Sequence, residues 1–177
     1  MLLKSFGCSF IFGTDLSDAE MIPNTPGNPS NYSWPALLAK DKQYEYQCYA
    51  SPGAGNLKTL EKILTQATND ESSIFVIGWS WIDRYDFLAP SYTKGHWDRV
   101  NNEYWYTIMP IDNDDNAIFY YKNLHSQFCD KLKTLTYIRC AIDTLKNKNI
   151  NMYIPNKNIL TLYKSFISEF EKLFNID

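Results

Sequence analysis

The feature that most constrains the fold of this chain is the unbroken apolar run Ile74-Phe75-Val76-Ile77, which Gly78 closes. A run that does not alternate between apolar and polar residues is typical of a strand whose two faces are both covered, as in a parallel sheet. A second apolar run, residues 2–6, ends in the same way at Gly7. The sequence therefore predicts a buried parallel sheet with a tight turn after each of these strands.

Segments with the three-to-four-residue spacing of a helix alternate with the predicted strands along the chain. Such alternation is typical of an α/β protein with a parallel sheet. The predicted strands are residues 2–6, 44–50, 74–77 and 152–154. The predicted helices are residues 33–40, a segment from 56 up to the polar stretch 69–71, a long amphipathic segment over 121–145, and 159–174.

Length and composition place the chain among ordinary globular proteins. Its 177 residues suit one domain, 1–177, with 45% apolar and 21% charged residues. A net charge of -3 without a basic block argues against nucleic acid as a partner. No apolar run spans a bilayer and no secretory signal opens the chain, so we expect no membrane association and a cytoplasmic location. The four cysteines lack metal-ligand spacing, so we expect reduced thiols and no metal site.

Residues 79–116 are less regular and rich in aromatic side chains, and we interpret them as an insertion or lid. Trp79 and Trp81 follow the third strand directly and are the candidates for contact with a substrate. The alternative is a small secondary core or a subunit contact. Residues 112–116 begin like a calcium loop, but Ala117 stands where that loop needs Gly and Asn123 where it needs Glu, which favours a solvated turn.

Small residues follow three of the predicted strands, at positions 7–9, 51–56 and 78–80. Ligands of a parallel sheet gather beyond the carboxyl ends of its strands, so these loops are expected to meet in one crevice. Ser9, which follows the turn at Gly7, is the candidate nucleophile. Backbone N–H groups of Ser9 and of the loop from Gly53 to Asn56 are candidates for binding the oxyanion of a tetrahedral intermediate.

These three loops resemble the first three sequence blocks of the SGNH (GDSL-like) hydrolase family. Residues 4–10, Lys-Ser-Phe-Gly-Cys-Ser-Phe, resemble the first block in the Gly-Cys-Ser-Phe form of phage and environmental members, with Ser9 as nucleophile. Residues 51–56 resemble the second block, in which Gly53, Gly55 or Asn56 takes the oxyanion position. Residues 78–80 resemble the third block, with Ser80 as the further oxyanion donor.

The resemblance implies a three-layer α/β/α sandwich with a mainly parallel sheet in a flavodoxin-like strand order. It also implies hydrolysis of a carboxylic ester through an acyl-Ser9 intermediate, without a metal or organic cofactor. The implied substrate is a small-molecule or carbohydrate ester, an acetyl group on a sugar being one example. The resemblance covers roughly the first half of the chain and the later helix–strand order.

The chain also departs from the family pattern. Cys8 stands where the wider family has Asp, and Ser80 where it has Asn. The family base belongs to a C-terminal Asp-x-x-His block, and neither His96 nor His125 lies in one. After the predicted helix 159–174, only residues 175–177 remain for a fifth strand and that block. We therefore expect a truncated SGNH-like chain with weak or no activity.

Several alternatives remain open at this point. His125 fits a half-buried structural role beside the long helix, whereas His96 lies in a loop that could fold over the crevice. The whole chain could be a non-catalytic binding or structural module on the same fold. A phosphate or nucleotide binder ranks last, because the chain has no P-loop or dinucleotide glycine pattern. Cys8 is expected to be buried and inert. The sequence leaves the substrate and the oligomeric state undefined.

Overall fold

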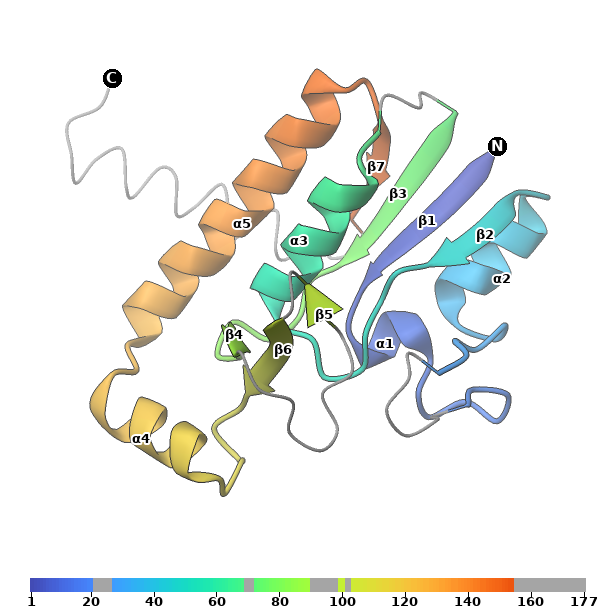
Figure 1. Ribbon diagram of the computed structural model, residues 1–177. Coiled ribbons are helices and arrows are strands. Elements are labelled where there is room, and N and C mark those ends of the chain that lie inside the picture. Colours follow the sequence, from blue (N-terminus) through green and yellow to red (C-terminus); the bar gives the residue numbers. More distant parts are fainter. Residues whose placement is uncertain (21–26, 69–71, 90–98, 101–102, 155–177) are drawn as a thin grey trace.

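The computed structural model describes residues 1–20, 27–68, 72–89, 99–100 and 103–154. Within them the chain is an α/β protein with a mainly parallel sheet. The four predicted strands are confirmed as β1 (Leu2–Gly7), β2 (Glu45–Cys48), β3 (Ser73–Gly78) and β7 (Asn151–Tyr153). They are parallel and lie in the order β2-β1-β3-β7 (Figure 1).

The two interior strands are those with unbroken apolar runs. β1 pairs with β2 on one side and with β3 along its whole length on the other, where the register runs from Leu2 opposite Ser73 to Gly7 opposite Gly78. Phe75 and Val76 are adjacent in β3 and are both fully buried. Neighbouring strand residues face opposite sides of a sheet, so both faces of β3 are covered.

Helices supply that cover on both faces. α3 (Asn56–Gln66) and α5 (Gln127–Asn147) lie on one side of the sheet, and α2 (Trp34–Asp41) lies on the other (Figure 1). The first side contains the main core cluster, which comprises Phe6, Leu60, Ile63, Ala67, Phe75, Ile77, Ala141, Leu145 and Ile150. On the second side Ala39 of α2 packs against Leu3 and Val76.

The single long helix predicted over 121–145 is wrong, because two helices occupy that part of the chain. α4 spans Asp115–Asn123, and α5 begins at Gln127 after a break. The N–H groups of Leu124 and His125 both donate to the carbonyl of Tyr120 at 2.9 Å, which closes α4. The Ser126 hydroxyl then accepts from the N–H of Cys129 at 3.4 Å and caps α5. Apolar spacing continues across the break and conceals it.

The acidic stretch 112–116 starts a helix. The Asp114 carboxylate accepts hydrogen bonds from the backbone N–H groups of Asn116 at 3.0 Å and Ala117 at 3.1 Å. This is the usual role of Asp before the first turn of a helix, where it satisfies N–H groups that have no helical partner. The resemblance to a calcium loop therefore reflects a helix cap.

The segment 79–116 contains a small antiparallel sheet that the sequence analysis did not predict. Its strands are β4 (Tyr85–Ala89), β5 (Arg99–Val100) and β6 (Glu103–Ile108), in the order β4-β6-β5. The rings of Tyr85 and Tyr120 stack with centroids 4.2 Å apart, and those of Phe87 and Tyr106 stack at 5.3 Å. These contacts agree with the alternative of a small secondary core for this segment.

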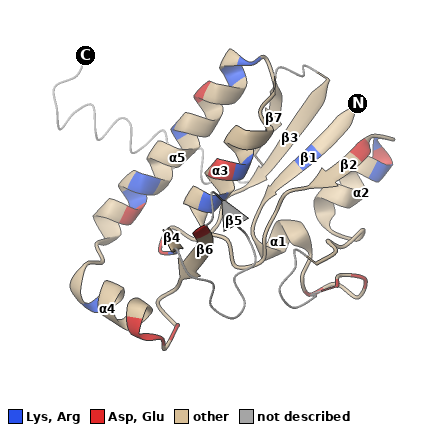
Figure 2. Ribbon diagram, viewed as in Figure 1, with Lys and Arg blue, Asp and Glu red and all other residues tan. Residues whose placement is uncertain are grey.

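Charged residues are scattered over the helices and loops (Figure 2). Neither sign forms a continuous stripe in this view, in agreement with the small net charge of -3. None of the helices in the described part of the chain is both long and apolar enough to cross a membrane. The predicted helix 159–174 and His96 lie outside the described residues.

Candidate functional site

The carboxyl ends of β1, β2 and β3 meet at one edge of the sheet. Gly7 and Gly78, the last residues of β1 and β3, are paired in the sheet register. The N–H of Ser51, which follows β2, donates to the carbonyl of Gly7 at 3.0 Å. The loops that contain Ser9, Gly53 and Ser80 therefore leave the sheet from adjacent points. This is the position at which open α/β sheets bind their ligands.

Gly7 allows the chain to leave β1 beneath α1 (Ser9–Phe12). Its φ is +147°, and a β-carbon at this position would lie 2.4 Å from the carbonyl oxygen of Gly78 and 2.7 Å from Cγ1 of Ile11. Ile11 of α1 packs into the space left by the two glycines and is itself buried. Glycine is required here by close approach as well as by backbone conformation.

Ser9 is the first residue of α1, and its side chain is partly exposed. The carbonyl of Cys8 accepts from the N–H groups of Ile11 at 3.0 Å and Phe12 at 3.1 Å, so the helix starts directly at the serine. Within the described residues the Ser9 hydroxyl has no hydrogen-bond partner and no imidazole beside it. The hydroxyl is accessible, but no visible base activates it.

Cys8 is buried, as predicted, with 3% of its surface exposed, whereas Cys129 and Cys140 are exposed. In the native protein we expect maleimide to modify Cys129 and Cys140 at least about tenfold faster than Cys8, because reaction requires an accessible thiolate. Peptide mass spectrometry after timed labelling measures all three thiols in one sample. Cys8 labelling as fast as Cys140 labelling would contradict the buried position.

The side chain of Asn56 links the second loop to the third. Its Oδ1 accepts from the N–H of Ser80 at 2.7 Å, and its Nδ2 lies 3.3 Å from both the Ser80 carbonyl and Thr134 Oγ1. The N–H of Gly55 is also engaged, by Asp86 at 2.9 Å. Of the three alternatives for the oxyanion position, Gly55 therefore has a backbone N–H that is already hydrogen-bonded. The side chain of Asn56 is also engaged, so only its backbone N–H could bind an oxyanion. Gly53 has φ +77° and open space beside its α-carbon.

Ser80 is 9% exposed, and its hydroxyl is buried without a hydrogen-bond partner in the residues that the structure describes. Buried polar side-chain atoms nearly always have a partner, so this hydroxyl has an unused donor. It lies two residues beyond Gly78, as Ser9 lies two residues beyond Gly7. The role of Ser80 as an oxyanion donor stays a prediction.

The two tryptophans proposed to contact a substrate differ in their surroundings. Trp79 is partly buried and packs against the main core cluster, which favours a structural role. Trp81 is 65% exposed and remains available to a ligand.

His125 lies in the turn between α4 and α5, and its Nε2 is 2.8 Å from Oδ2 of Asp130. The side chain of His125 is 30% exposed, and that of Asp130 is 6% exposed. This turn lies well apart from α1 in Figure 1, so His125 is not beside Ser9. The break after α4, which the apolar spacing concealed, is what places the histidine in a turn rather than along a long helix.

The histidine–aspartate pair borders a hollow of about 520 Å³, which is lined by Ile82, Asp83, Pro110, Tyr121, His125, Gln127 and Asp130. Tyr120 lies behind the pair, with its hydroxyl 3.5 Å from Oδ1 of Asp130. Burial, and next the nearby charge of Asp130, raise the pKa of Tyr120 to about 12. Tyr120 therefore stays protonated at neutral pH. The sequence analysis did not pair His125 with Asp130, because their contact depends on the unpredicted turn.

Comparison with known proteins assigns no family to this chain. No family model and no curated protein matches the chain. A solved structure of a protein assigned to the G-D-S-L family of lipolytic proteins, from Desulfitobacterium hafniense DCB-2, is similar over 99% of this chain and 74% of its own. The two are 15% identical with a TM-score of 0.42, and a similarity of this size supports no conclusion about activity.

Proposed function

We propose that the chain is an SGNH-type serine ester hydrolase, a three-layer α/β/α sandwich with Ser9 as nucleophile and with weak or no turnover. The observation that carries the proposal is the meeting of three small-residue loops at the carboxyl ends of β1, β2 and β3. Ser9 stands there at a helix start with a partly exposed hydroxyl. A nucleophile in such a position faces a ligand in the crevice.

In the proposed reaction Ser9 Oγ attacks the carbonyl carbon of an ester, and the hydroxyl proton passes to water. The N–H groups of Ser9 and Gly53 and the hydroxyl of Ser80 hold the negative oxygen of the tetrahedral intermediate. The alcohol then leaves with a proton, and water hydrolyses the acyl-Ser9 ester. The proposed substrate is a small-molecule or carbohydrate ester, to which Trp81 offers an exposed ring.

A fluorophosphonate probe tests the proposal, because it phosphonylates a reactive serine without needing a general acid for its release. We expect slow labelling of the native chain on the peptide that contains Ser9, and at least about tenfold less in Ser9→Ala. Peptide mass spectrometry locates the adduct, and circular dichroism checks that the variant is folded. Equal labelling of the two proteins would refute Ser9 as the nucleophile.

A non-catalytic binding or structural module on the same fold is the second candidate. It is favoured by one observation: the single histidine in the described residues is tied to Asp130, away from Ser9. Such a module would retain the fold without a reactive serine. Absence of probe labelling in a folded native chain is the result that this candidate requires.

A further inference from the structure

Strand β4 contacts the loop 53–56 through a buried carboxylate. Asp86 is 5% exposed, and its Oδ1 accepts from the N–H of Gly55 at 2.9 Å while its Oδ2 accepts from the N–H of Lys58 at 3.0 Å. These N–H groups lie at the start of α3, where helical partners are absent. A β-carbon on Gly55 would lie 2.5 Å from both carboxylate oxygens, so glycine allows this approach.

The carbonyl of the preceding residue, Ala54, is held by Arg84, which directly precedes β4. Nη1 of Arg84 donates to the carbonyl of Ala54 at 3.0 Å. The Ala54 carbonyl and the Gly55 N–H belong to one planar peptide unit, so Arg84 and Asp86 hold both its acceptor and its donor. Asp86 of β4 and Arg84, which directly precedes the strand, thereby fix the rotation of the peptide plane in the middle of the loop.

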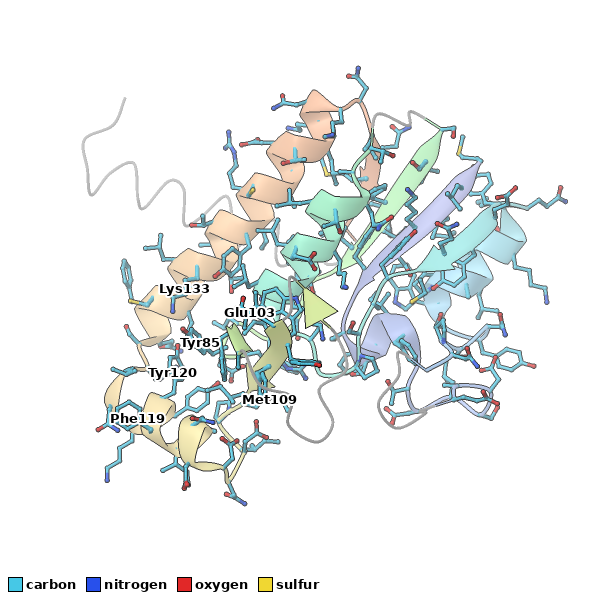
Figure 3. The ribbon with its side chains drawn as sticks, viewed as in Figure 1. Tyr85, Glu103, Met109, Phe119, Tyr120 and Lys133 are labelled. Atoms are coloured by element: carbon cyan, nitrogen blue, oxygen red, sulfur yellow. The ribbon has the colours of Figure 1, made fainter. Side chains whose placement is uncertain are left out.

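The strand that provides these contacts is itself held in place. Thr107 of β6 donates its hydroxyl to Oδ1 of Asp86 at 2.6 Å. Tyr85, which lies between Arg84 and Asp86 in the sequence, stacks on Tyr120 of α4. Nζ of Lys133 of α5 lies 4.9 Å from the ring centre of Tyr85. Figure 3 shows Tyr85, Tyr120 and Lys133 close together where β4, α4 and α5 meet. β4 is therefore anchored on the side away from the loop.

Asp86 also changes what the start of α3 can bind. A helix N-terminus with free N–H groups attracts anions, but here a carboxylate already occupies it. Burial raises the pKa of Asp86, and the hydrogen bonds from Lys58, Thr107 and Gly55 act in the opposite direction. The occupied helix start argues against the phosphate or nucleotide binder among the alternatives.

We infer that Arg84 and Asp86 are positioning residues that hold the loop 53–56 in the orientation needed to stabilise an oxyanion. Strands β4 and β6 then act as a fixed brace for this loop. This inference rests on the proposed function. An oxyanion site gains its effect from donors that are already aligned before reaction, and a brace supplies that alignment.

Hydrogen exchange tests the brace without any reference to activity. In Asp86→Ala we expect the peptide covering 53–58 to exchange at least about tenfold faster than in the native chain. The matched control is Asp114→Ala, which removes another helix-capping aspartate, at α4, and should leave exchange at 53–58 unchanged. Unchanged exchange in a folded Asp86→Ala protein would overturn the inference.

Milder variants keep the test decisive if Asp86→Ala does not fold. Arg84→Met removes the donor to the Ala54 carbonyl, whereas Arg84→Lys can still donate. Thr107→Val removes the hydroxyl that donates to Asp86, whereas Thr107→Ser retains it. We expect faster exchange at 53–58 in the Met and Val variants, with exchange nearer to native in the Lys and Ser variants. Equal exchange in all four, at the native rate, would refute the brace.

The same variants separate this inference from the proposed function. If the fluorophosphonate probe labels native Ser9, we expect Arg84→Met and Thr107→Val to slow labelling by about 10- to 100-fold, since lost alignment weakens oxyanion stabilisation. Native labelling that these folded variants leave unchanged would overturn the positioning role. If the native chain is not labelled at all, the proposed function fails and so does the positioning role, whereas the exchange data still report whether the brace exists.

Discussion

Gly7→Ala is expected to lower the free energy of unfolding by about 3 kcal/mol, a large share of the stability of a domain of this size. The new β-carbon would lie 2.4 Å from the carbonyl oxygen of Gly78, a backbone atom that no rotamer change can move. It would also adopt a φ of +147°, which L-residues rarely occupy. Relief requires β1 and β3 to separate at the site.

Gly78→Ala is the matched control for this change. Its β-carbon would meet the side chain of Ile11 at 2.6 and 2.7 Å, and the nearest backbone atom, the carbonyl oxygen of Phe6, would be 3.9 Å away. A side chain can shift, so we expect a loss of about 1 kcal/mol. Urea unfolding monitored by circular dichroism measures both. Equal losses in the two variants would show that the Gly7 backbone is not constrained as described.

The rate of ester hydrolysis is expected to lie far below that of a hydrolase with an intact serine triad. A short-chain nitrophenyl ester should be hydrolysed about four to six orders of magnitude more slowly than an intact serine triad allows, since loss of the base costs that much. Ser9 has no imidazole beside it in the part of the chain that the structure describes, and His125 is bound to Asp130 elsewhere. The initial rate of nitrophenolate release measures the deficit.

Three variants show whether any residual turnover belongs to the site. Ser9→Ala should reduce it to the buffer rate, whereas His125→Ala should leave it unchanged. His96→Ala tests the hypothesis that this loop residue reaches the crevice. Fast turnover that disappears in Ser9→Ala and also in His96→Ala would contradict a missing base and identify His96 as the base.

The sequence was sufficient to predict the parallel sheet because a strand that is buried on both faces consists of consecutive apolar residues. Ile74 to Ile77 could be interpreted as an interior strand without any knowledge of its neighbours. Gly7 and Gly78 marked the strand ends, and the sites after them, for the same local reason. The position of Ser9 at a carboxyl end of the sheet followed from these two observations.

Other features could not be predicted because they depend on contacts between distant segments. The turn at 124–126 interrupts an apolar spacing that continues across it, so only the capping bonds of Ser126 and Tyr120 reveal the break. Asp86 is one acidic residue in an aromatic segment, and nothing local connects it with Gly55. The roles of His125 and Asp86 are set by tertiary structure, which single-sequence patterns do not report.

The place of β1 in the middle of the sheet has a consequence for how the protein is made. During synthesis β1 lacks its neighbour on one edge until β2 appears, and its other edge stays open until β3 is complete at Gly78. Pairing two strands that are far apart in the sequence is slow compared with forming a helix. In the interval an unpaired apolar strand is exposed, of the kind that other chains readily join. The newly made chain, rather than the folded one, is therefore the species most exposed to aggregation.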